Sequence, residues 1–118
     1  MIKHQKSLTL VPQGAYKAKL VKVNRSFNAY GERINFEFYL YGENVEGVLL
    51  TRSTNPLLTA KSKLAEVLNG LLGRDLTEYE VNEGVDIEQM IGTVCNVLVL
   101  NNKSKTGTTY SNVERIFQ

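Results

Sequence analysis

Hydrophobic and polar residues alternate with a period of two in several parts of the chain, and this pattern predicts a mainly β protein. The clearest part is residues 33–41, where Ile34, Phe36, Phe38 and Leu40 are separated by polar residues and tyrosines. A short turn over 42–44 leads into an apolar stretch over 45–52, so we expect a hairpin. Because residues 48–50 are all apolar, both orientations of this third strand stay open.

The stretch from 14 to 24 predicts a first strand whose apolar residues change face. They occupy one face up to Leu20 and the other face from Val21 onward. A change of phase between adjacent apolar residues indicates a β-bulge or a strong bend, typical of a strand that serves two sheets. Residues 25–32 are rich in polar and turn-forming residues, so we expect a loop there.

A helical spacing of apolar residues follows the third strand. Asn55 and Pro56 have the properties of a helix start, with Thr54 or Asn55 as the cap, and Gly73 has those of a helix end. We therefore expect one helix across this stretch. Residues 74–92 are acidic and irregular, with a helical turn expected near 86–91.

The last part of the chain predicts two more strands. Residues 93–100 are almost continuously apolar, which indicates burial on both faces, and a polar loop over 101–107 separates them from a strand over 108–117. Residues 1–12 are polar, then apolar, and end at Pro12, as expected of an N-terminal arm or an edge strand.

The expected order of elements is three strands, one helix and two strands, in a single domain over residues 1–118. A five-stranded OB-fold barrel, with a bent first strand and one α-helix between strands three and four, has this order. An SH3-like barrel or a small sandwich has about five strands too, but neither normally needs the long helix.

Composition narrows the class of protein. No apolar run approaches the roughly 18 residues of a membrane-spanning helix, and the first residues do not resemble a signal peptide. The single cysteine, Cys95, permits no internal disulfide. We therefore expect a cytoplasmic protein without a membrane partner.

The formal net charge of +2 hides an uneven distribution. Residues 1–63 carry +6, residues 64–92 carry −6 and residues 93–118 carry +2. A polyanion suits the basic part if the acidic segment lies on another face. The alternative is a solvated surface whose charges serve only solubility.

Catalytic chemistry has little support in the sequence. The one histidine, His4, lies in the expected arm, and Cys95 lies in the most apolar strand, where a thiol is inert. One cysteine and one histidine do not supply the usual ligands of a zinc site. We expect no enzyme activity and no cofactor.

Two expected loops combine basic, aromatic and amide residues, and in an OB-fold these loops flank the nucleic-acid groove. Tyr39 and Tyr41 share the polar face of the strand between them. Aromatic rings stack on unpaired bases, and Lys and Arg neutralise phosphates. The candidate nucleic-acid-binding residues are Arg25, Phe27, Tyr30, Arg33, Tyr39, Tyr41, Arg52, Lys103, Lys105 and Tyr110.

Each candidate has a structural alternative. Phe27 suits packing on the barrel mouth, Lys103 and Lys105 suit solubility, and the two tyrosines suit packing against the arm or a second subunit. Other functional hypotheses are therefore an OB-fold protein-interaction or phage-assembly module without DNA binding, and a metal-dependent nuclease that uses the acidic segment 75–88.

Four stretches, 14–20, 34–38, 91–94 and 109–113, resemble small phage-encoded OB-fold proteins. The whole chain is similar to the single-stranded DNA-binding proteins of lactococcal siphophages. This resemblance implies sequence-nonspecific binding of single-stranded DNA in phage DNA replication and recombination, in the host cytoplasm, as a homo-oligomer (dimer or higher) beside a recombinase. It places DNA along the candidate residues above, Tyr110 excepted. The acidic tail by which bacterial-type relatives recruit partners has no counterpart before Gln118, so we do not expect that route of recruitment.

Overall fold

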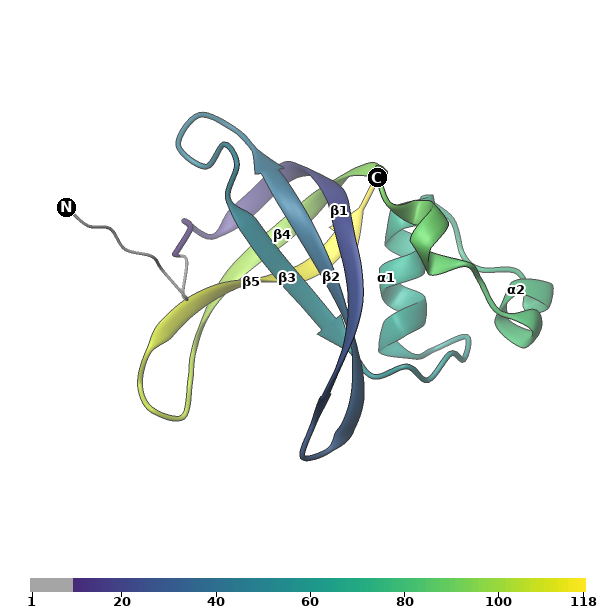
Figure 1. Ribbon diagram of the computed structural model, residues 1–118. Helices are drawn as coiled ribbons and strands as arrows, with labels where there is room; N and C mark the ends of the chain where they lie inside the picture. The colour runs from purple at the N-terminus through teal and green to yellow at the C-terminus, as the bar shows by residue number, and fades with distance from the viewer. Residues whose placement is uncertain (1–9) are drawn as a thin grey trace.

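The structure, a computed structural model, describes residues 10–118, which contain five strands in one antiparallel sheet (Figure 1). The strands are β1 (Gly14–Asn28), β2 (Gly31–Tyr41), β3 (Leu49–Thr54), β4 (Val94–Lys103) and β5 (Thr109–Phe117). Their order across the sheet is β3-β2-β1-β4-β5. Between β3 and β4 the chain forms helix α1 (Lys63–Leu72), helix α2 (Glu78–Glu83) and a 3₁₀ helix (Ile87–Met90). The mainly β class is confirmed, and the expectation of a single α-helix is wrong.

The core lies on the inner face of the curved sheet. In β2 the four alternating residues Ile34, Phe36, Phe38 and Leu40 are at most 3% exposed, as predicted. Helix α1 packs its apolar side, including Val67 and Leu68, against the same cluster. In β4 only every second residue is buried, so the expectation that both of its faces are buried is wrong.

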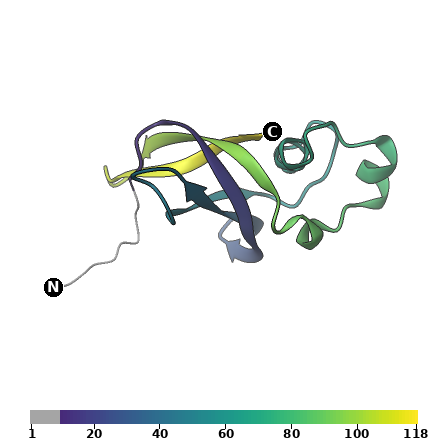
Figure 2. The same ribbon diagram turned by 90° about the horizontal axis from the view of Figure 1, so that it is seen from above.

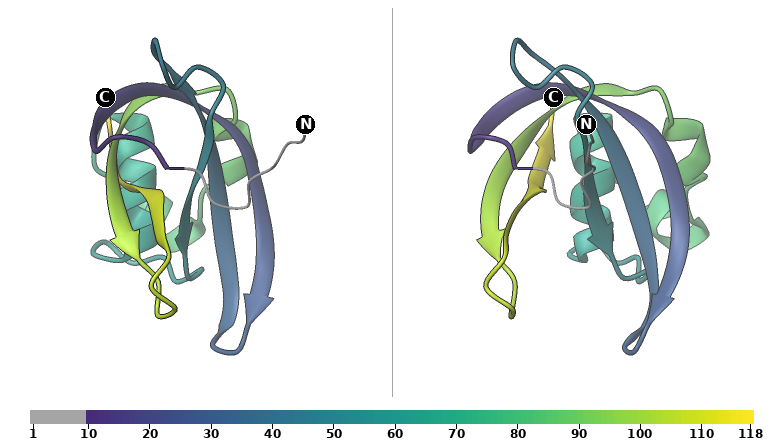
Figure 3. Two further views of the ribbon diagram at one scale, coloured as in Figure 1. Left: turned by 90° about the vertical axis from the view of Figure 1, so that its left-hand side faces the viewer. Right: turned by 60° about the vertical axis from the view of Figure 1, so that its left-hand side comes forward.

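Strand β1 contains the predicted bulge. Its register with β2 shifts between Leu20 and Lys22, where the apolar residues change face. The first part of β1 also pairs with β4. Both neighbours belong to one strongly curved sheet, so the expectation of two sheets is wrong (Figure 3).

Strands β3 and β5 are the two edges of the sheet, and its curvature brings them near each other (Figures 2 and 3). No backbone ladder joins these edges in the described part of the chain. A side chain bridges them instead, since Arg52 Nη1 donates a hydrogen bond to the backbone oxygen of Glu114 at 2.9 Å. The sheet is therefore curled but not closed.

Helix α1 begins at Lys63 and not at Asn55–Pro56 as predicted. Ser62 is its N-cap, because Ser62 Oγ accepts a hydrogen bond from the backbone N–H of Ala65 at 3.1 Å. The helix ends at Gly73 as predicted, with a left-handed φ of +75°. The chain between β3 and this helix is irregular.

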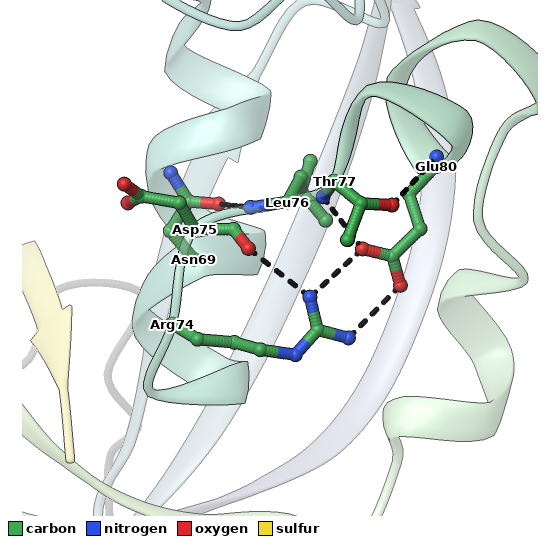
Figure 4. Close-up of polar contacts among 6 residues, drawn as sticks. All are labelled: Asn69, Arg74, Asp75, Leu76, Thr77 and Glu80. Carbon is green, nitrogen blue, oxygen red and sulfur yellow. Dashed lines mark hydrogen bonds and ion pairs between the residues drawn. The ribbon is translucent and has the colours of Figure 1, made fainter.

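The acidic segment contains helix α2, which the pattern did not predict. Thr77 and Glu80 form a capping box at its start. Arg74 Nη1 and Nη2 donate to the two carboxylate oxygens of Glu80 at 2.8 and 2.9 Å (Figure 4). Chiefly through its hydrogen bond with Arg74, the pKa of Glu80 is lowered to about 2. The expected helical turn near 86–91 is confirmed as the 3₁₀ helix.

Residues 1–9 of the expected arm lie outside the described residues, and residues 10–13 form no strand. Val11 is nevertheless buried, at 2% exposure. Its N–H donates to Ser111 Oγ at 2.7 Å, and Ser111 Oγ donates to the Val11 carbonyl at 3.2 Å. These hydrogen bonds tie the segment before β1 to β5. Among the described helices, none combines the length and apolar character needed to span a bilayer.

Candidate nucleic-acid interface

The hairpin of β1 and β2 leaves two aromatic rings exposed to solvent. The strands pair as far as Asn28 and Gly31, so Arg25 and Phe27 lie on β1 and not in the loop predicted over 25–32. Ala29 and Tyr30 form the turn, where Asn28 Oδ1 accepts a hydrogen bond from the Tyr30 N–H at 2.8 Å. Phe27 is 79% exposed and Tyr30 is 93% exposed. Both rings therefore lie outside the hydrophobic core, one at the end of β1 and one in the turn.

The two arginines of this hairpin have partners in the fold. Arg25 Nη1 lies 2.7 Å from Glu32 Oε2 across the hairpin, and the Arg25 side chain is still largely exposed to solvent. Arg33 donates from Nε to Ser53 Oγ at 3.2 Å and from Nη2 to the Ser53 carbonyl at 3.1 Å. Arg33 therefore fastens β2 to β3, whereas Arg25 keeps surface available for an anion.

The hairpin of β4 and β5 carries the second group of candidates. Lys103 is the last residue of β4, and Lys105 lies in the turn, which Ser104 organises by hydrogen bonds to Thr108. Both lysines are exposed, and neither forms an ion pair with another described residue. Tyr110 lies opposite Asn102 in the register and is half-buried. Strand β4 therefore extends through residues 101–103, which were predicted as loop.

Both hairpin tips project from the same end of the molecule (Figures 1 and 3). The structure therefore brings Arg25, Phe27 and Tyr30 to the same end as Lys103 and Lys105. In the right-hand view of Figure 3, β3 and α1 appear between the two hairpins, with α1 behind. An extended polyanion that lies across this end can meet rings on one hairpin and cations on the other.

Tyr39 and Tyr41 lie toward the other end of β2, about 26 and 33 Å along the strand from Gly31 at the hairpin tip. Their ring centroids are 5.0 Å apart. Tyr39 Oη also donates to Glu46 Oε2 at 3.3 Å, and burial together with Glu46 raises the pKa of Tyr39. The structure does not bring this pair together with the hairpin candidates.

Arg52 is also apart from them, on the inner side of the sheet. Arg52 pairs with the buried Phe36 in the register, so its side chain starts on the inner face of the sheet. From there it extends toward β5, where Nη1 donates to the Glu114 carbonyl. Its Nε atom is buried without a hydrogen-bond partner. The neighbours Leu50 and Thr54 point inward and Leu49 points outward, which decides the orientation that the sequence left open.

The acidic segment approaches the first hairpin. Asp86 and Glu88 line a hollow of about 490 Å³ together with Arg25 and with apolar residues that include Ile34 and Ile87. These carboxylates oppose phosphate on that side of Arg25. Tyr30, at the hairpin tip, does not line this hollow.

No other chemistry gathers around these residues. Burial raises the pKa of the Cys95 thiol to about 11. In the described range 10–118, no group of three or more His, Cys, Asp or Glu side chains lies close enough to hold a metal ion.

Strand β1 carries two lysines, Lys17 and Lys19, before its bulge. The register places Lys19 opposite Tyr39 and Lys17 opposite Tyr41, on the outer face. The polar alternation in β1 was the available signal, but only the bulge position determines which tyrosine each lysine meets.

Comparison with known proteins adds no assignment, because no protein-family model and no curated protein matches the chain.

Proposed function

We propose that this protein binds single-stranded DNA without sequence preference, by stacking bases on Phe27 and Tyr30 and pairing phosphates with Lys103, Lys105 and Arg25. The observation that carries the proposal is the exposure of two aromatic rings on a hairpin that projects beside a second, cationic hairpin. Exposed rings are costly to leave in water, and unpaired bases cover them without hydrogen-bond readout.

The curled sheet supports a finer description of the fold, a partly open five-stranded OB-fold barrel. It has a bulged first strand, edges β3 and β5 that approach each other, and helix α1 between strands three and four. In an OB-fold, the loops joining strands one to two and four to five flank the nucleic-acid site, as the two hairpins do in this proposal. A role in phage replication and recombination, beside a recombinase, rests on the sequence resemblance alone.

The test is fluorescence anisotropy of a labelled oligo-dT, a duplex of equal length and an oligo-U RNA, each at two salt concentrations. We expect the single strand to bind more tightly than the duplex and less tightly as salt rises. The RNA arm shows whether the sugar matters.

Variants separate stacking from charge. Phe27→Ala and Tyr30→Ala should each weaken binding by about 1–3 kcal/mol, with little change in the salt slope. Lys103→Ala/Lys105→Ala should make the slope shallower by about 0.7 log units for each phosphate that is no longer neutralised. Leu57→Ala and Lys61→Ala, exposed positions before α1, are the matched controls.

Two results would count against the proposal. If the folded protein binds none of the three nucleic acids, the barrel serves another purpose and a protein-interaction or assembly module becomes the leading hypothesis. If it binds but the hairpin variants behave like the controls, the binding surface lies elsewhere.

A further inference from the structure

We propose that the outer face around Tyr39 is a self-association surface, and that its partner is helix α2 of a second copy of this chain. The face consists of two neighbouring rows across the sheet. One row is Leu49, Tyr39, Lys19 and Val94, and the next contains Tyr41 and Lys17. We call these six residues the tyrosine–lysine face.

The face exposes apolar surface beside unpaired cations. Leu49 is 47% exposed and Val94 is 48% exposed, one at each end of the first row. Lys19 lies between them and Lys17 in the next row, and neither lysine forms an ion pair with another described residue. Mixed apolar and cationic surface of this kind suits a protein partner that offers an apolar anchor within a negative surround.

The tyrosines themselves favour a protein over a nucleic acid on this face. Their rings lie at 56° to each other with centroids 5.0 Å apart, so they pack together and do not offer parallel platforms for successive bases. Two carboxylates share this face, and each has a neighbour of its own: Glu46 accepts from the Tyr39 hydroxyl and the Gly42 N–H, and Glu37 lies opposite Lys22 in the register.

Helix α2 has the complementary properties. It has no buried residue, and Tyr79 is 74% exposed on it. Glu83 is four residues after Tyr79 and therefore lies on the same side of the helix, and Glu78 adjoins it in sequence. The helix thus offers one aromatic ring with carboxylates around it.

The Arg74–Glu80 pair holds this helix in place although the helix contributes nothing to the core. Glu80 is occupied by Arg74 and by the Thr77 N–H, so it does not compete for the lysines (Figure 4). Arg74 and Glu80 are in this sense positioning residues.

The surface is small, which predicts weak association. Four strands at about 4.8 Å spacing make a row about 14 Å across, well below a standard interface. Association should therefore appear at tens to hundreds of micromolar and weaken with salt, since exposed charge pairs are screened.

The test is sedimentation velocity at rising protein concentration without DNA, at low and at high salt. Lys17→Glu/Lys19→Glu and Glu78→Lys/Glu83→Lys should each weaken self-association at least about tenfold, by setting like charges against each other. An equimolar mixture of the two variants should restore it, because each then offers what the other lacks. If the two variants had lost self-association because they were misfolded, mixing them would not restore it.

A matched control separates this surface from the DNA hairpins. Lys103→Glu/Lys105→Glu changes the formal net charge from +2 to −2, as Lys17→Glu/Lys19→Glu does. It should leave self-association unchanged. Tyr79→Ala should weaken association without a change of net charge.

The proposal is overturned if the wild-type protein stays monomeric at low salt up to several hundred micromolar. It is equally overturned if the two charge-reversed variants associate like the wild type, or if their mixture stays monomeric while each is folded by circular dichroism. None of these results depends on whether the protein binds DNA.

Discussion

Gly70 offers a sharp test of how closely helix α1 packs on the sheet. It lies inside the helix, and a β-carbon added there would be 2.1 Å from the backbone oxygen of Ile116 in β5 and 2.7 Å from its carbonyl carbon. Both atoms belong to the backbone of a paired strand, so neither can rotate away. Gly70→Ala therefore forces the helix and β5 apart.

The expected change in stability follows from two opposing effects. In an exposed helix interior, alanine is more stable than glycine by about 1 kcal/mol. An ordinary contact of at least 3.4 Å requires a separation of about 1.3 Å, and gaps of about 1 Å forfeit a large part of the dispersion attraction of the residues that line them. Overpacking of this kind costs about 1–3 kcal/mol. Since the added atom meets backbone, we expect the steric cost to lie at the upper end of this range, about 3 kcal/mol, which leaves a net loss of about 2 kcal/mol after the gain in helix preference.

Thermal unfolding followed by circular dichroism measures this directly. For a chain of this length, 2 kcal/mol corresponds to a Tm lower by about 8 °C. Glu66→Ala, on the exposed side of the same helix, is the control and should change Tm by little. A Gly70→Ala protein with an unchanged or higher Tm would mean that α1 does not lie against Ile116 as described.

Three further predictions concern other parts of the molecule. Ser111→Ala should lower the free energy of unfolding in urea by about 1–3 kcal/mol, because it leaves the buried N–H of Val11 without a partner. Cys95 should react slowly with a thiol reagent at pH 8 in the folded protein and rapidly in guanidinium chloride, since burial raises its pKa to about 11. In a pH titration followed by NMR, the carboxyl of Glu80 should titrate near pH 2. The stabilisation by its pair with Arg74 is complete above the ordinary glutamate pKa and is lost as the pH falls toward 2.

Sequence periodicity predicted the parts of the fold that the core determines. Phe36 and Phe38 alternate with polar residues because one face of β2 is buried, and the change of phase at Leu20 marks the bulge. The end of α1 at Gly73 was equally readable, because a left-handed cap favours glycine. In each case one local signal and the tertiary packing agree.

The predicted start of α1 was wrong because the sequence contains two possible helix starts. Asn55 and Pro56 have the chemistry of a helix start, and so has Ser62. Tertiary packing decides between them: the residues that α1 buries begin at Leu64, whereas Leu57 is 60% exposed. Which residues become buried depends on the path of the chain from β3 to the helix. The local sequence around residues 55–62 does not determine that path.

The length of the first hairpin was missed for a different reason. Residues 25–28 have no buried face, so they show no hydrophobic alternation. Cross-strand polar contacts extend the ladder beyond the core, with Arg25 bonded to Glu32, and Asn35 bonded to both Asn24 and Ser26. A strand that leaves the core is stabilised by pairing alone, and a pattern of hydrophobic and polar residues does not show which polar residues pair.

The same extension explains why the predicted groove divides into two surfaces. In the sequence, Tyr30 and Tyr39 form one group because Tyr30 lies in a predicted groove loop and Tyr39 on the polar face of the next strand, but β2 separates them along its length. Tyr30 is 93% exposed, whereas Tyr39 packs on Tyr41 and donates to Glu46. An isolated exposed ring suits a base that arrives unstacked, and a packed, hydrogen-bonded ring beside a carboxylate suits a protein surface. The difference in exposure between chemically identical residues is therefore what separates the proposed DNA site from the proposed self-association site.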